Sequence, residues 1–174
     1  MTIDAAKEPA TRGRLFDRLA ELGISVKTVE HPPVFTVAES EELHREIPGG
    51  HTKNLFLKDA KGRLFLVIAH ADTEIDLKNL HKRLGAARFS FGKPELLFET
   101  LGVEPGSVTA FALINDTEQR VSVVLDQALM QFDTINCHPL QNTATTSIAR
   151  EDLLRFILAC GHAPGVADLT STAD

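Results

Sequence analysis

The 174-residue sequence lacks several features that define large classes of protein. It has two cysteines, Cys137 and Cys160, so no disulfide framework is expected, and it contains neither C-x-x-C nor H-E-x-x-H. No apolar run approaches the roughly 18 residues of a membrane span, and the polar start over residues 1–14 lacks the apolar centre of a signal peptide. No G-x-G-x-x-G or Walker loop occurs. These absences predict a reduced, cytoplasmic protein that uses no structural metal, dinucleotide or phosphate-binding loop.

What remains is an ordinary globular composition with an uneven distribution of charge. Hydrophobic residues make up 43% and charged residues 24% of the chain, and the length favours one domain over residues 1–174. The net charge is -6, yet residues 44–93 hold ten Lys or Arg against five Asp or Glu and are therefore basic. A locally basic segment on an acidic chain suits contact with a polyanion, although interleaved surface charges would give the same count. Residues 1–10 are expected to be disordered, and residues 162–174 are expected to form a loose tail.

The hydrophobic pattern predicts irregularly alternating strands and helices, several of them joined by short turns. This pattern favours a mixed β-sheet flanked by helices over a doubly wound parallel fold. The expected helices span residues 11–23, 38–47, 76–84, 93–101 and 147–160. The expected strands span residues 24–29, 53–58, 63–70, 88–91, 108–114, 120–125 and 134–137, with an extended segment over 142–148.

The most informative stretch is P-G-G-H-T-K-N-L-F-L, residues 48–57, which begins as a loop and ends as a strand. Paired glycines allow the backbone to bend closely around a small group, and the apolar residues that follow start a rigid element. Lys53 and Asn54 lie where the loop passes into the strand, so a site built there is held by the strand and reached from the loop. The competing interpretation is a hairpin entry with a solvated lysine.

Two other segments bear on a site. In the loop over residues 102–107, Pro105-Gly106 suits a type II turn with Gly106 at positive φ. The short acidic helix expected over residues 38–47 lies between chain breakers and is a candidate lid. Cys137 precedes His138, but neighbours on a strand point to opposite faces, so they make a poor nucleophile and base pair. The residues therefore favour binding chemistry, in which a lysine, loop amides and a histidine hold a small polar substrate and polarise a carbonyl.

Several of these segments together resemble a known family. The stretch at 48–57, L-G-V-E-P-G-S-V-T at 101–109, I-N-D at 114–116, N-C-H-P-L at 136–140 and H-P-P-V-F at 31–35 are similar to motifs of the YbaK-like aminoacyl-tRNA deacylases, most of all the free-standing prolyl-tRNA editing proteins. The resemblance covers nearly the whole chain. It implies an α/β (α+β) fold with a partly barrel-like sheet flanked by helices.

The resemblance also implies an activity: hydrolysis of a wrong amino acid, alanine above all, from tRNA(Pro). Alanine is smaller than proline, so a synthetic site sized for proline cannot exclude it, and a second site is needed to remove it. Lys53 would inherit the role most tied to activity, by binding the acyl ester or terminal ribose and stabilising negative charge. Water assisted by the 2′-hydroxyl of the terminal adenosine would attack, without cofactor or metal. The expected substrate-binding residues are Asn54, Gly102, Pro105, Gly106, Ser107 and His138.

The implied partners are the acceptor end of tRNA(Pro) and prolyl-tRNA synthetase, with no DNA or membrane, and the chain is expected to be a monomer. Arg88, Lys82 and Arg83 are the predicted tRNA contacts. Cys137 stands where phenylalanine is common in the family, so the smaller side chain could enlarge the pocket. Two alternatives stay open: the same reaction on cysteine or serine, and a non-catalytic module of this fold that binds tRNA or a nucleotide.

Overall fold

The computed structural model describes residues 8–34 and 36–170. Phe35 of the H-P-P-V-F motif and most of the segment predicted to be disordered lie outside the described residues. The α-helices are α2 (Arg12–Glu21), α3 (Val37–Glu46), α4 (Leu77–Arg83), α5 (Pro94–Leu101) and α6 (Arg150–Ala159). The strands are β1 (Lys27–Glu30), β2 (Gly50–Asp59), β3 (Leu64–His70), β4 (Phe89–Phe91), β5 (Val121–Asp126), β6 (Thr134–Cys137), β7 (Ala144–Ala149) and β8 (Gly165–Ala167). Short 3-10 helices are η1 (Pro105–Ser107), η2 (Ala110–Asn115) and η3 (Gln127–Gln131).

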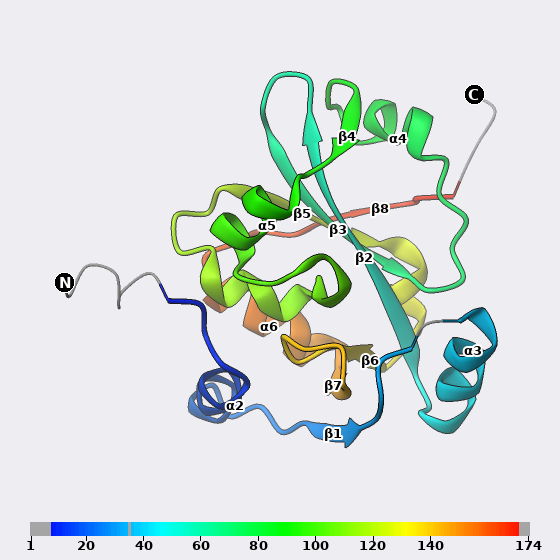
Figure 1. Ribbon diagram of the computed structural model, residues 1–174, viewed down its shortest axis with the longest axis vertical. Helices are drawn as coiled ribbons and strands as arrows, with labels where there is room; N and C mark the ends of the chain where they lie inside the picture. Colours follow the sequence, from blue (N-terminus) through cyan, green and yellow to red (C-terminus); the bar gives the residue numbers. More distant parts are fainter. Residues whose placement is uncertain (1–7, 35, 171–174) are drawn as a thin grey trace.

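The strands form one mixed sheet in the order β1-β7-β6-β2-β3-β5-β8, with β4 added beside β2. The long strand β2 is its centre, because it pairs antiparallel with β3 and β4 and parallel with β6. β5 lies parallel to β3 and to β8, and β1 lies antiparallel to β7. The mixed sheet flanked by helices is therefore confirmed, and its strand order ends at β1 and β8 rather than closing into a barrel (Figure 1).

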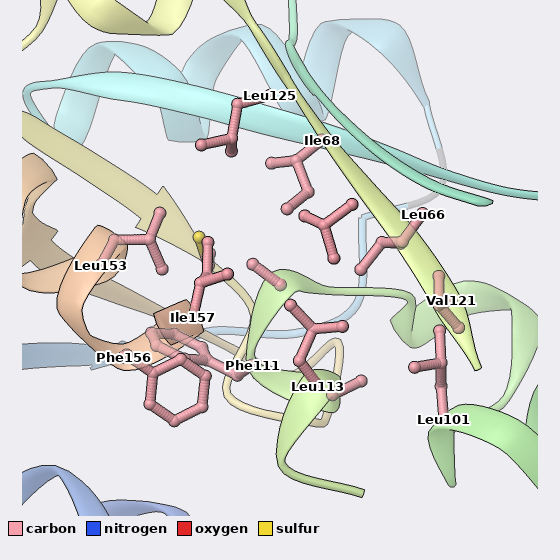
Figure 2. Close-up of a cluster of buried hydrophobic side chains, with 14 of the residues drawn as sticks. Leu66, Ile68, Leu101, Phe111, Leu113, Val121, Leu125, Leu153, Phe156 and Ile157 are labelled. Atoms are coloured by element: carbon pink, nitrogen blue, oxygen red, sulfur yellow. The ribbon is translucent and has the colours of Figure 1, made fainter. Parts of the chain in front are cut away.

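Alternating side chains of β2, β3 and β5 supply two hydrophobic clusters, one on each face of the sheet. The larger cluster joins Leu66, Ile68 and Leu125 to α2, α5, η2 and α6. Figure 2 shows these strand side chains on one side of the cluster and those of η2 and α6, Phe111 and Phe156 among them, on the other. The smaller cluster packs the opposite residues of the same strands under α4. Both faces of the central strands are thus covered, which makes β2 a rigid support for what lies at its ends.

The helix α3 begins with a capping box. The Thr36 side chain accepts a hydrogen bond from the Glu39 backbone amide, and the Glu39 side chain accepts one from the Thr36 amide. Its hydrogen-bonded last turn is followed by Ile47, which is buried, and then by the Pro48 loop. The helix predicted over residues 38–47 is therefore present within one residue of its expected bounds, beside the first residues of β2 (Figure 1). Its movement as a lid stays a prediction.

Two local predictions were wrong. The buried strand expected over residues 108–114 is the 3-10 helix η2, which Thr109 caps by accepting a hydrogen bond from the Phe111 amide. Ala110 through Leu113 are buried on every side, so the apolar run carries no periodicity that separates strand from helix. The type II turn expected at Pro105-Gly106 is a 3-10 turn, in which the Ser107 amide donates a hydrogen bond to the Glu104 carbonyl. Gly106 does not adopt positive φ.

The loose tail predicted from residue 162 is corrected over the residues that the structure describes. His162 is buried, β8 extends the sheet by pairing with β5, and Leu169 is 1% exposed in the cluster under α4. Only two large apolar residues, Val166 and Leu169, lie within residues 162–169, which is too few to show this in the sequence. At the other end, Ala10 is buried and its amide donates to the Asn115 side chain. Within the described part of the chain, no helix is long and apolar enough to span a membrane.

Candidate active site

A cavity of about 370 Å³ opens where β2 begins, between α3, the end of β3 and the end of β6. The helix contributes one wall, and the strands contribute the floor. Charged and polar side chains converge there from segments that are far apart in the sequence. Its lining residues include Glu41, His44, His51, Lys53, Asp72, Cys137 and His138.

The glycines of the Pro48-Gly49-Gly50 loop allow close contact with β6. Gly49 has φ +113, and a Cβ there would lie 2.9 Å from the Thr134 carbonyl oxygen. A Cβ on Gly50 would lie 2.9 Å from the ring of Phe132. The glycines therefore let the backbone approach the protein itself, not a small ligand as the sequence suggested. This close approach permits the parallel pairing of Gly50 with Ile135 and sets the start of β2.

Lys53 extends from the rigid part of β2 and reaches the turn after β3. Its Nζ donates a hydrogen bond to the Thr73 carbonyl oxygen at 2.5 Å. Within residues 8–34 and 36–170, no carboxylate forms an ion pair with Lys53. A neutral acceptor holds the ammonium group without cancelling its charge, so the charge is available to an anionic group in the cavity.

Burial favours the neutral forms of the histidines that line the cavity. Burial lowers the pKa of His138, whose Nδ1 donates to the Ala144 carbonyl at 3.0 Å, so Nε2 of the neutral ring keeps its lone pair. Burial likewise lowers the pKa of His51 and His44. These two rings stack with centroids 4.1 Å apart, and His51 Nε2 donates to the Ile47 carbonyl at 2.7 Å. The stack joins α3 to β2 across one wall of the cavity.

Cys137 lines the wall of the cavity, and its burial disfavours the thiolate form that a nucleophile requires. Burial raises the pKa of its thiol to about 12, so the group stays protonated at neutral pH. The side chain is 2% exposed and contacts the hydroxyl of Thr52, which in turn donates to the Asn136 carbonyl at 2.8 Å. Cys137 and His138 line the same cavity, so the expectation that they point to opposite faces was wrong. The raised pKa of the thiol is what argues against a catalytic pair.

The structure brings His138 of the predicted substrate-binding set together with the predicted catalytic residue Lys53, and it places the other predicted substrate-binding residues elsewhere. Asn54 follows Lys53 on the strand and faces the larger core cluster, where its buried Oδ1 has no hydrogen-bond partner among the described residues. Gly102 caps α5 at φ +66 and lines a different cavity, beside Asn115. Pro105, Gly106 and Ser107 form η1, which does not line the cavity of Lys53.

The predicted tRNA contacts lie near the other end of β2. Lys82 and Arg83 belong to α4, and Arg88 directly precedes β4; all three are exposed. Arg83 also donates to the Asp168 carbonyl at 3.2 Å. Because β4 pairs with residues 57–59 of β2, this basic surface lies about five residues, or roughly 17 Å, along the strand from Lys53. Figure 1 shows α4 and β4 at one end of β2 and α3 at the other.

Comparison with known proteins agrees with this arrangement. The sequence matches the aminoacyl-tRNA editing domain over residues 31–156. It is 43% identical over 155 residues to prolyl-tRNA synthetase associated domain-containing protein 1 of Danio rerio, covering 88% of this chain and 84% of that protein. It is 38% identical over 146 residues to the prolyl-tRNA editing protein ProX of Acetoanaerobium sticklandii, covering 83% and 89%.

A solved structure described as a candidate trans-editing enzyme for prolyl-tRNA synthetase shares the fold. Its TM-score is 0.70 at 21% identity, and the alignment covers 94% of this chain and 99% of that one. The chain belongs to the aminoacyl-tRNA editing domain family. Its enzyme class is aminoacyl-tRNA deacylase.

Proposed function

We propose that this protein removes a wrongly attached amino acid from tRNA(Pro), with alanine as the preferred acyl group. The observation that carries the proposal is the convergence of an unneutralised Lys53 and a neutral His138 on one cavity. The relatives described as prolyl-tRNA editing or prolyl-tRNA synthetase associated proteins support tRNA(Pro) as the substrate. Alanine follows from size, since a synthetic site for proline cannot exclude a smaller side chain.

In the proposed reaction, water attacks the carbonyl carbon of the aminoacyl ester. The 2′-hydroxyl of the terminal adenosine assists removal of a proton from the attacking water. A bond forms from the carbonyl carbon to the water oxygen, and the bond to the ribose oxygen breaks. The leaving ribose oxygen takes up a proton, so the products are a free amino acid and an intact tRNA. Lys53 stabilises the negative charge that develops on the carbonyl oxygen. His138 lines the acyl pocket and orients the substrate through Nε2.

The small side chain of Cys137 is an argument for other amino acids as substrates of the same reaction. Its small buried side chain lines the cavity of Lys53 and leaves space that a larger residue would fill. Cysteine or serine esters are therefore the alternative substrates.

We further propose that the chain acts as a monomer, with the acceptor stem lying over Lys82, Arg83 and Arg88. Their exposed charges could follow the phosphates while the terminal adenosine enters the cavity.

The test is deacylation of Ala-, Cys-, Ser- and Pro-tRNA(Pro) by the wild-type protein and by Lys53→Ala. We expect loss of alanine with proline retained, and a fall in kcat of about 10²- to 10³-fold in the variant, as for removal of one oxyanion donor. Lys58→Ala is the matched control for kcat, because Lys58 lies on the same strand but is exposed and outside the cavity; kcat should stay near the wild-type value.

The outcomes separate the alternatives. Loss of cysteine or serine in place of alanine would keep the mechanism and reassign the substrate. Retention of every acyl group, with tRNA still bound, would identify a non-catalytic binding module. For the proposed RNA surface, Lys82→Ala and Arg88→Ala should raise KM and reduce its salt dependence, with kcat little changed.

A further inference from the structure

The carboxylate of Asp126 is buried at the end of β5, directly behind the turn that holds Lys53. Asp126 is 1% exposed and accepts three hydrogen bonds. Oδ1 accepts from the Ala128 amide at 2.9 Å, which begins η3. Oδ2 accepts from the His70 amide at 3.0 Å and from the Thr73 hydroxyl at 2.6 Å. One carboxylate therefore fixes the end of β3, the following turn and the start of η3.

Thr73 connects this carboxylate to the candidate catalytic lysine. Its hydroxyl donates to Asp126, while its backbone carbonyl accepts from Lys53 Nζ at 2.5 Å. The Thr73 side chain is 6% exposed, and its amide donates to the His70 carbonyl at 3.0 Å. The turn is held from two sides, which sets the direction of the Thr73 carbonyl.

We propose that Thr73 and Asp126 are positioning residues that hold the Lys53 ammonium group for catalysis; this inference rests on the proposed function. A lysine side chain is long and flexible, so an unheld ammonium group would occupy many positions in the cavity. Direct pairing with Asp126 would fix the ammonium group but neutralise it. The Thr73 carbonyl instead holds the ammonium group through a neutral acceptor. The Asp126 carboxylate acts on Lys53 only indirectly, by holding Thr73.

The test compares Thr73→Val with Thr73→Ser. Valine keeps the shape and the backbone carbonyl but cannot donate to Asp126, whereas serine keeps the hydroxyl. For Thr73→Val we expect kcat to fall about 10- to 100-fold with KM within twofold, because small misplacement of a catalytic group costs about this much. Thr73→Ser should restore kcat to within about threefold. Thr109→Val, which removes a buried hydroxyl that accepts from the Phe111 amide and does not line the cavity, should leave kcat unchanged.

A second readout does not depend on activity. The Lys53 side-chain ammonium signal in a ¹H–¹⁵N spectrum, assigned by its loss in Lys53→Arg, should be sharp in the wild-type protein and in Thr73→Ser. The signal should broaden in Thr73→Val and in Asp126→Asn. If Thr73→Val does not fold, Asp126→Asn provides the test in its place. A wild-type protein inactive on every aminoacyl-tRNA would refute the proposed function. Unchanged kcat in Thr73→Val of an active enzyme, or an unchanged ammonium signal, would overturn the positioning role.

Discussion

Replacing Asn136 should show how the loop before Lys53 is held. Asn136 is 2% exposed on β6 and makes two side-chain hydrogen bonds across the sheet. Nδ2 donates to the Pro48 carbonyl at 3.1 Å, and Oδ1 accepts from the Ser147 hydroxyl at 2.5 Å. Asn136→Ala removes both bonds and leaves the Pro48 carbonyl without this donor.

The expected cost follows from these contacts. Each hydrogen bond contributes about 1 kcal/mol net, and a buried polar group left unpaired adds about 1–3 kcal/mol. Asn136→Ala removes two bonds and leaves a polar group unpaired, so it should lower the free energy of unfolding by about 3–5 kcal/mol. Ser147→Ala removes only the second bond, but it leaves Oδ1 of the buried Asn136 unpaired, so it should cost about 2–4 kcal/mol. The difference between the two variants measures the bond to Pro48.

Urea unfolding at pH 7.5 gives both free energies by linear extrapolation, and deacylation is measured on the same preparations. Because Pro48 leads into the strand that carries Lys53, kcat should fall in Asn136→Ala and stay near the wild-type value in Ser147→Ala. Equal stability losses in the two variants would refute the reasoning, since the bond to Pro48 would then contribute nothing. A destabilised Asn136→Ala with full kcat would show that the loop does not position Lys53.

The cavity histidines and the buried cysteine allow two further predictions. Burial lowers the pKa of His44, His51 and His138 in the folded protein below the ordinary histidine pKa of 6.5, which applies to the unfolded chain. Near and below pH 6.5 the unfolded chain therefore binds more protons than the folded protein. The free energy of unfolding should decrease as the pH falls through this value. Urea unfolding at pH 7.5 and 5.0 should show this decrease. His51→Gln should have a smaller change in the free energy of unfolding between the two pH values than the wild-type protein. An equal change in the variant and the wild-type protein would contradict a contribution from His51. Because burial raises the pKa of Cys137 to about 12, iodoacetamide at pH 8 should neither modify this thiol nor slow deacylation, as mass spectrometry and rate assays can check; inactivation by alkylation at Cys137 would refute its inert role.

The sequence predicted the parts of the fold that local chemistry determines. Breakers flanking apolar runs located β2, β3 and the short turn between them, and the resemblance directed attention to Lys53 and His138. Local patterns failed where burial was uniform, as in η2, and where few residues carried the signal, as in β8. In both cases tertiary contacts decided the outcome.

Residues that act across the sheet were not predictable from the sequence. Asp126 looks like an ordinary cap at the end of a strand, and nothing local connects it with Thr73 or Lys53. The loop at Gly102 looked like a pocket wall because its motif accompanies the others, yet it caps α5 beside Asn115. A motif shows which residues belong together in a family, while sheet register determines which of them meet.

The central position of β2 has a consequence for how the enzyme becomes active as it folds. The β2–β3 hairpin closes a short loop and can form early, but it carries only Lys53 of the two predicted groups. His138 joins it only when Gly50 pairs with Ile135, which requires closure of a much longer loop. In refolding, formation of the hairpin should therefore precede the return of deacylation, and the rate of that return reports the long-range pairing of β2 with β6.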